Sequence, residues 1–236
     1  MAKRRMSLTA DHVARVHKHV ENKGLDPTYV YHTDEEYQAL IDGLLAQRPE
    51  GDDFWLFASG SLIWKPEMEY LESRVATIRG YHRSFCLYMR QWRATPEQPG
   101  LMMALDRGGQ CKGVIFRLDH DNMEEQLRKL LRREMRMRPS NNLARWVVAQ
   151  TDQGPVPALA FVMNRKGPAY VGRLPMEETA RMLARACGHI GSCAEYLFNT
   201  VTHLEEMGIH DRHLWHLQEL VAAQIAEDHA PEGGDL

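Results

Sequence analysis

One carboxylate stands out at the end of a helix that the sequence predicts over residues 121–137. The apolar side chains of this segment form one helical stripe of Met123, Leu127, Leu130 and Leu131. Glu134 lies four positions after Leu130 and therefore continues the stripe that faces the core. Burial raises the pKa of a carboxyl group towards neutrality, which suits a general acid or base. Glu134 is therefore a candidate catalytic acid/base.

A purely structural interpretation of Glu134 competes with this one. Four arginines surround it in the sequence: Arg132, Arg133, Arg136 and Arg138. Charged residues of a helix usually belong to solvated or paired sets, so a salt bridge to one of these arginines would also explain a glutamate here. The helical pattern alone leaves both interpretations open.

A second candidate is the turn made by Ser59, Gly60, Ser61 and Leu62, which follows the aromatic run at 54–57. Small side chains let backbone N–H groups approach a ligand closely. A nest of such amides can hold a carboxylate or a developing oxyanion. The alternative is an ordinary tight turn, since serine and glycine are common turn residues.

The elements that must position these candidates change in character along the chain. Thr33 and Glu36 have the spacing of a capping box, which predicts a helix to about Gln47. Apolar runs or alternation predict strands at 54–57, 84–89, 101–105, 111–118, 145–149 and 156–163. Further helices are expected at 7–20, 121–137, 176–186, 192–207 and 211–227, with Asp121, Ser192 and Asp211 as N-caps. Strands in the middle with helices around them favour an α+β fold with a small closed barrel.

Composition narrows the class of protein. The 236 residues carry a net charge of −3, which gives no basic footprint, so nucleic acid is not an expected partner. No run approaches the ~20 apolar residues of a membrane helix, so no membrane partner is expected. The four cysteines show neither a C-x-x-C pair nor a disulfide framework, which favours a reducing, cytoplasmic location. His210, His213 and His216 spread around a helix, so no metal site is expected.

Several motifs together resemble the ChaC-type γ-glutamylcyclotransferases. The segment 57–64, Phe-Ala-Ser-Gly-Ser-Leu-Ile-Trp, is similar to the signature turn of that family. The resemblance continues in the same order with Pro99-Gly100-Leu101, Arg107-Gly108-Gly109 and the segment 111–118. It extends to Arg132-Arg133-Glu134-Met135, where the family carries its catalytic glutamate, and to the segments 191–200 and 208–211. The motifs span roughly residues 53–220.

The resemblance implies a fold, a reaction and a set of site residues. We expect a γ-glutamylcyclotransferase-like barrel surrounded by helices, with a helical N-terminal extension over residues 1–50, a catalytic domain over 51–227 and a disordered tail over 228–236. The implied reaction is the cyclisation of glutathione to 5-oxoproline and cysteinylglycine without a metal or organic cofactor. Glu134 would be its acid/base, and Ser59, Gly60, Ser61 and Leu62 would cradle the substrate. The wider superfamily places a tyrosine near the substrate, which suggests Tyr170 as a ligand.

Two alternatives remain open beside this assignment. The tyrosine that usually precedes Gly-Ser-Leu in the family is Ser59 here, and the preceding glycine is Ala58, so another γ-glutamyl amino acid or amine is a second candidate substrate. A non-catalytic protein that binds γ-glutamyl compounds is the third hypothesis. Tyr170 also has a structural interpretation, because tyrosine often combines a buried ring with a solvated hydroxyl. The patterns predict no particular oligomeric state.

Overall fold

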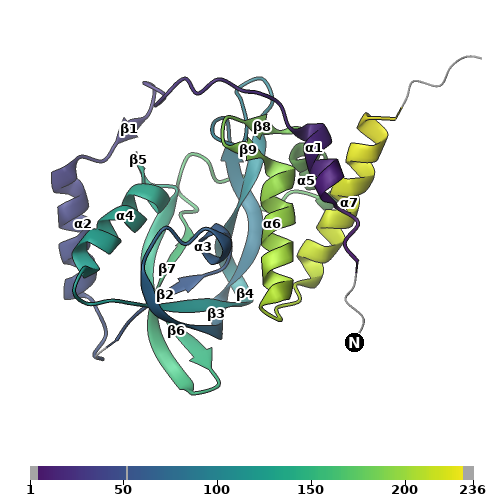
Figure 1. The fold of residues 1–236 in the computed structure, drawn as a ribbon. Helices are drawn as coiled ribbons and strands as arrows, with labels where there is room; N and C mark the ends of the chain where they lie inside the picture. The colour runs from purple at the N-terminus through teal and green to yellow at the C-terminus, as the bar shows by residue number, and fades with distance from the viewer. Residues whose placement is uncertain (1–4, 52, 231–236) are drawn as a thin grey trace, which may run out of the picture. The chain divides into compact units, whose positions relative to one another are not determined.

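The computed structural model describes residues 5–51 and 53–230, and contacts within the chain divide it into two compact units (Figure 1). The first unit joins Met1–Lys23, Tyr88–Met102 and Arg173–Leu236, and the second joins Gly24–Leu87 and Met103–Gly172. The division predicted at residues 50 and 51 is a different one and stays a prediction. Most of the tail predicted to be disordered, residues 231–236, lies outside the described residues.

The second unit is built on a closed barrel, which confirms the predicted fold class. Its strands follow the order β2-β4-β3-β6-β7. Their bounds are β2 Phe54–Ala58, β3 Tyr70–Met89, β4 Gly100–Leu118, β6 Asn142–Thr151 and β7 Gly154–Met163. Strand β2 runs antiparallel to β4 and parallel to β7, and this pairing closes the barrel. Trp55, Phe57, Ile78 and Ile115 are among the side chains that fill its core.

Strands β3 and β4 are much longer than the runs that predicted them. The sequence indicated only 84–89 for β3, because the first half of this strand carries exposed and charged side chains instead of an apolar alternation. Its second half is buried from Arg83 to Cys86. The extra length comes from backbone pairing between strands, which side-chain composition does not encode.

Two long helices, the one-turn helix α3 (Ser61–Trp64) and a small strand pair accompany the barrel in this unit. Helix α2, Asp34–Ala46, begins with the predicted capping box of Thr33 and Glu36. Helix α4, Met123–Glu134, contacts α2, and β1, Val30–Tyr31, pairs with β5, Met137–Arg138 (Figure 1). The sequence predicted that α4 extends from an Asp121 cap to residue 137. Both ends were wrong: Asn122 is the N-cap and makes no side-chain cap bond, and the helix ends at Glu134 because the chain turns into β5.

The first unit is mainly helical. Its elements are α1 Ala10–Val16, α5 Met176–Arg185, the hairpin of β8 Cys187–Gly188 and β9 Gly191–Ser192, α6 Cys193–Glu206 and α7 Arg212–Asp228. Helix α1 contacts α6 and α7, and α5 packs on α7. The predicted Asp211 cap is present, since its carboxylate accepts from the amides of His213 and Leu214. No helix in the described part of the chain is long and apolar enough to cross a membrane.

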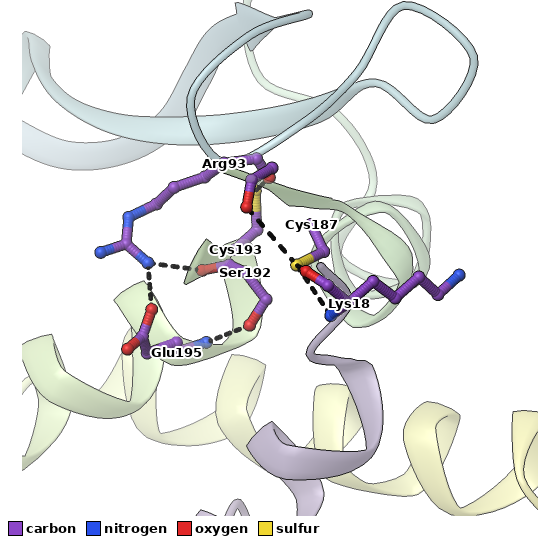
Figure 2. Close-up of polar contacts among 7 residues, drawn as sticks. Lys18, Arg93, Cys187, Ser192, Cys193 and Glu195 are labelled. Carbon is purple, nitrogen blue, oxygen red and sulfur yellow. Dashed lines mark hydrogen bonds and ion pairs between the residues drawn. The ribbon is translucent and has the colours of Figure 1, made fainter. Parts of the chain in front are cut away.

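Ser192 and Glu195 at the start of α6 have the spacing of a capping box, and only the serine half of it forms. Ser192 Oγ accepts from the Glu195 amide at 3.0 Å, as expected of the cap (Figure 2). The Glu195 carboxylate turns away to Arg93, whose Nη1 lies 2.5 Å from Glu195 Oε2 and 2.8 Å from the Ser192 carbonyl. Arg93 is buried, and a buried charge requires an ionic partner. The Glu195 carboxylate therefore pairs with Arg93 instead of bonding to the N-cap backbone.

Candidate active site

Glu134 is the last residue of α4 and is held by the helix that precedes it. Leu127, Leu130 and Leu131 are almost completely buried, and they fix the face of the helix from which Glu134 extends. The Glu134 side chain is 19% exposed, so its carboxyl group is sheltered yet reachable. Asn142 Nδ2 donates to the Glu134 carbonyl at 3.1 Å and lies 3.5 Å from Glu134 Oε2. The predicted burial of this carboxylate is therefore present.

The surroundings of Glu134 favour a proton carrier. Burial raises the pKa of its carboxyl group, and the charge of Glu67 raises it further. Arg133 acts in the opposite direction, by charge and by hydrogen bonding, and the net pKa stays above the ordinary glutamate value. A carboxyl group balanced in this way exchanges a proton more readily near neutral pH than a solvated one does.

The turn at 59–62 connects strand β2 to the short helix α3, Ser61–Trp64. Its first residue is tied to the barrel by Arg83, which is buried in β3. Arg83 Nε donates to the Ser59 carbonyl at 2.7 Å, and its Nη2 donates to the Lys112 carbonyl at 2.5 Å. This side chain therefore links the turn to β4.

The close approach of β4 to the turn requires a glycine at position 113. A Cβ atom there would lie 2.4 Å from the Ala58 carbonyl oxygen and 2.6 Å from the Phe57 ring. Because real Cβ contacts are never so short, only glycine lets β4 pass this close to the end of β2. Gly113 belongs to the motif at 111–118, and its role in positioning the turn explains why a small residue stands there.

The first two backbone amides of helix α3, those of Ser61 and Leu62, belong to this turn. Ile63 N donates to the Gly60 carbonyl at 2.9 Å and Lys65 N to the Ser61 carbonyl at 2.7 Å. The first amides of a helix have no carbonyl acceptor within that helix, so those of Ser61 and Leu62 stay outside its ladder. Two neighbouring amides of this kind are the donors that an oxyanion or a carboxylate requires.

Arg133 joins Glu134 to this turn. Its Nε lies 3.2 Å from Glu134 Oε1, and its Nη2 donates to Ser61 Oγ at 3.0 Å. Nη1 donates to the Lys65 carbonyl at 2.6 Å and lies 3.0 Å from Glu67 Oε2. The structure therefore brings the two strongest sequence candidates, Glu134 and the turn, into contact with one guanidinium group.

Tyr170 belongs to a separate polar cluster on the same unit. Its hydroxyl donates to Asp106 Oδ2 at 3.1 Å, and Arg165 Nε lies 2.6 Å from Asp106 Oδ1. Burial and the Asp106 carboxylate raise the pKa of Tyr170. Among the described residues, no polar contact links Tyr170 to Glu134 or to the turn. Its role as a substrate ligand stays a prediction.

Asp106 holds this cluster together. Its side chain is 4% exposed, and burial alone would raise the pKa of its carboxyl group. Hydrogen bonds from Arg165, the Arg107 amide and Tyr170 outweigh burial and lower that pKa. Asp106 is therefore an ionised, buried anion. Burial of Cys86, together with the charge of Asp106, raises the pKa of the Cys86 thiol to about 11.

Several residues that shape the site carry no local signal in the sequence. Arg133 was one of four arginines near Glu134, and helical spacing could not tell which one faces the turn. Arg83 and Asp106 lie in the barrel strands and were not recognised as buried charges. Asn142 is brought to Glu134 by the turn from α4 through β5 into β6, which no local pattern indicated.

The chain is similar to known proteins over most of its length, including the segments that carry the motifs above. The family described as ChaC-like protein matches residues 54–224. The glutathione-specific γ-glutamylcyclotransferase of Escherichia coli (strain K12) is 36% identical over 200 residues, which cover 84% of this chain and 85% of that protein. The glutathione-specific γ-glutamylcyclotransferase 1 of Mus musculus is 31% identical over 183 residues, which cover 75% of this chain and 82% of that protein.

The fold has a counterpart among solved structures. A yeast γ-glutamyl cyclotransferase specific to glutathione superposes with a TM-score of 0.69 at 21% identity, over 76% of this chain and all of that one. At this identity the similarity concerns the fold alone, and it agrees with the closed barrel. The match over residues 54–224 includes both Glu134 and the 59–62 turn. The chain therefore belongs to the ChaC-like protein family.

Proposed function

We propose that this protein is a γ-glutamylcyclotransferase that converts glutathione into 5-oxoproline and cysteinylglycine. The observation that carries the proposal is the sheltered carboxyl of Glu134, joined through Arg133 to a turn with available amides. The similarity to glutathione-specific relatives of E. coli and mouse supports the choice of substrate. The reaction is an internal aminolysis, so water is not consumed.

The first step requires a free amine. The α-ammonium of the γ-glutamyl group has a pKa of about 8 and does not attack while it is protonated. The ionised Glu134 accepts one proton from it, and the nitrogen lone pair then attacks the γ-carbonyl carbon to close a five-membered ring. The raised pKa of Glu134 narrows the gap between donor and acceptor, which eases this transfer.

The second step stabilises negative charge on the attacked oxygen. We assign this task to the amides at Ser61 and Leu62, beside the small residue Gly60. Losing one such donor typically raises the barrier by ~3–4 kcal/mol. Arg133 supports the arrangement, because it fixes Ser61 in the turn and faces Glu134 with the same guanidinium.

The last step breaks the original amide bond. Glu134 returns its proton to the cysteinyl nitrogen as the tetrahedral intermediate collapses and the C–N bond to that nitrogen breaks. The ring nitrogen, which became positively charged on attack, then loses its second proton through Glu134 to the departing amine, so that cysteinylglycine leaves as an ammonium and the lactam nitrogen of 5-oxoproline is neutral. One carboxyl thus serves as base and then as acid, and the enzyme ends in its starting state. The products are 5-oxoproline and cysteinylglycine in equal amounts, and no proton is gained or lost by the protein.

The substrate is tested by a direct comparison. Purified protein is incubated with glutathione or with γ-glutamyl-alanine, and 5-oxoproline is measured for each. We expect faster release from glutathione. A preference for γ-glutamyl-alanine would contradict glutathione specificity. Such a preference would be attributed to Ser59, which lacks the ring of the family tyrosine. Tight binding of glutathione without any product would contradict the enzyme proposal and favour a binding protein.

We further propose that the protein acts in the reducing environment of the cytoplasm. All four cysteines are thiols and all are buried. The fold therefore does not depend on an oxidising compartment to form disulfides. Glutathione in its thiol form is also most abundant where such thiols persist, which matches the proposed substrate.

A further inference from the structure

The end of α4 is held in place by a segment that precedes the family match. We propose that residues 30–46, which we call the N-terminal bracket, position Glu134 for catalysis through a contact between His32 and Ser140. The bracket contains β1 and α2, and it lies before residue 54, where the match to the ChaC-like family begins. This inference rests on the proposed function and assigns a role to a segment that the catalytic motifs do not include.

Glu134 and its partner Asn142 are the two ends of a loop, residues 135–141. Asn142 Nδ2 contacts both the carbonyl and the carboxylate of Glu134. The distance between these two residues therefore depends on how the loop closes. A loop of seven residues has many conformations unless contacts from outside select one of them.

The bracket supplies those contacts along the backbone. Val30 pairs with Arg138 and Tyr31 with Met137, so β1 occupies the edge of β5 (Figure 1). The His32 amide continues the pairing and donates to the Arg136 carbonyl at 3.3 Å. Without β1, the polar backbone groups of this edge would lose their partners.

His32 adds a side-chain contact to the far part of the loop. Its Nε2 lies 3.0 Å from Ser140 Oγ. On the other side, Asn164 Nδ2 donates to the Ser140 carbonyl at 2.8 Å. Ser140 is buried, and these two contacts hold it between the bracket and the end of β7, two positions before Asn142 begins β6.

Glu36, His32 and Ser140 are arranged in the order of a nucleophilic triad, but their hydrogen bonds are inconsistent with that role. His32 Nδ1 lies 3.6 Å from Glu36 Oε2, with Ser140 on the opposite ring nitrogen. The Ser140 hydroxyl donates to the Met137 carbonyl at 3.0 Å, so the hydrogen of the His32 contact belongs to Nε2. An imidazole that donates to the serine cannot remove its proton, and the contact is therefore a positional one.

Helix α2 secures the bracket against α4 itself. Arg132 Nη2 lies 2.5 Å from Asp34 Oδ1, and its guanidinium lies over the Tyr37 ring at 5.7 Å. One turn earlier on α4, Arg128 donates to Gln38. Tyr37 and Ile41 are buried, which anchors α2 by apolar packing as well. The bracket thus contacts the segment on both sides of Glu134.

The test uses single variants of the full chain at both ends of the contact. His32→Ala and Ser140→Ala each remove the 3.0 Å hydrogen bond, and we expect kcat for glutathione to fall about 10- to 100-fold in each, since small misplacements have effects of this size. KM should change less than about twofold, because the substrate cradle at 59–62 is not altered. His32→Gln should restore part of kcat, because its amide can donate to Ser140 Oγ.

Two controls separate positioning from loss of structure. Glu50→Gln, at an exposed position that follows α2 and lies outside the bracket, should leave both constants unchanged. The double variant of His32→Ala and Ser140→Ala should be no slower than the slower single variant, since both remove one interaction. An unchanged kcat in both single variants, or a parallel loss of kcat and of folded protein without rescue by His32→Gln, would overturn the proposal.

A readout without turnover distinguishes this inference from the proposed function. Amide hydrogen exchange at residues 136–138 should accelerate about 10-fold or more in His32→Ala. If the wild type does not cyclise glutathione but this exchange accelerates, the proposed function fails while the bracket still holds the loop. Unchanged exchange in both His32→Ala and Ser140→Ala would refute the bracket whatever the activity of the wild type.

Discussion

Arg133 and Ser61 are 72 positions apart in the sequence and are joined by a hydrogen bond of 3.0 Å between Nη2 and Oγ. The same guanidinium faces Glu134 Oε1 at 3.2 Å. One side chain therefore sets both the position of the turn and the charge beside the proposed acid/base. Its removal should affect catalysis in two separable ways.

Arg133→Met should lower kcat/KM by about 100-fold, the size expected when a catalytic arrangement is misplaced. The acid limb of its pH profile should also move to higher pH, because the charge of Arg133 lowers the pKa of Glu134. Lys129→Met, at an exposed position of α4, is the matched control and should behave as the wild type. A loss of rate with no displacement of the acid limb would contradict the electrostatic part of this role.

Glu134 should weaken folding at neutral pH. Its pKa is raised in the folded protein, so the folded state prefers the protonated form, and stability falls as the pH rises through that pKa. Glu134→Gln cannot ionise. The stability of Glu134→Gln relative to the wild type should therefore be greater at about pH 8 than at about pH 4. Denaturant titrations at the two pH values measure this difference, with Glu125→Gln on the exposed side of α4 as control. The opposite trend would show that the carboxylate is not sheltered.

Asp106 should show the reverse dependence. Its pKa is lowered in the folded protein, so its contribution to stability is present above the unfolded pKa and is lost as the pH falls through the folded pKa. Asp106→Asn should therefore be clearly less stable than the wild type at neutral pH, and the difference should shrink in acid. Thermal unfolding across this pH range tests the prediction, and an equal difference at all pH values would contradict it.

Tyr170→Phe separates the two roles of the tyrosine. Loss of its hydrogen bond to Asp106 should reduce the free energy of unfolding by about 1 kcal/mol. If Tyr170 is also a substrate ligand, KM for glutathione should rise in addition. A variant with reduced stability but unchanged kinetic constants would leave Tyr170 as a structural residue.

Gly113→Ala should destabilise the protein by about 1–3 kcal/mol, because the added methyl group would collide with the Ala58 carbonyl and the Phe57 ring. Gly43→Ala is the matched control. Position 43 lies inside α2 with no atom within 4 Å of an added Cβ, so the same substitution should stabilise by roughly 0.5–1 kcal/mol. Equal effects of the two substitutions would argue against the close approach of β4 to the turn.

Local signals in the sequence were enough to predict the elements that have them. The Thr33 capping box and the Asp211 cap depend on residues near in sequence, and the structure contains both. The burial of Glu134 followed from one helical stripe. These features share a short range, so their residue types and spacing determine them.

The remainder of the site depends on pairing between distant segments. Asn142 reaches Glu134 only because α4 ends early and β5 pairs with β1, and no helical period encodes that end. Arg83 contacts the turn from β3, one position before the run at 84–89 that predicted this strand, and no local pattern indicated the contact. The bracket contact of His32 with Ser140 spans 108 positions and likewise has no local signature.

The most direct test of the central claim is a single-turnover reaction of Glu134→Gln with glutathione, followed by measurement of both products. The wild type should release 5-oxoproline and cysteinylglycine in equal amounts. Glu134→Gln should keep the circular dichroism spectrum and glutathione binding of the wild type while forming product at least about 1,000-fold more slowly, since it cannot carry the proton in either step. Product formation at the wild-type rate by this folded variant would contradict the assignment of Glu134 as the acid/base.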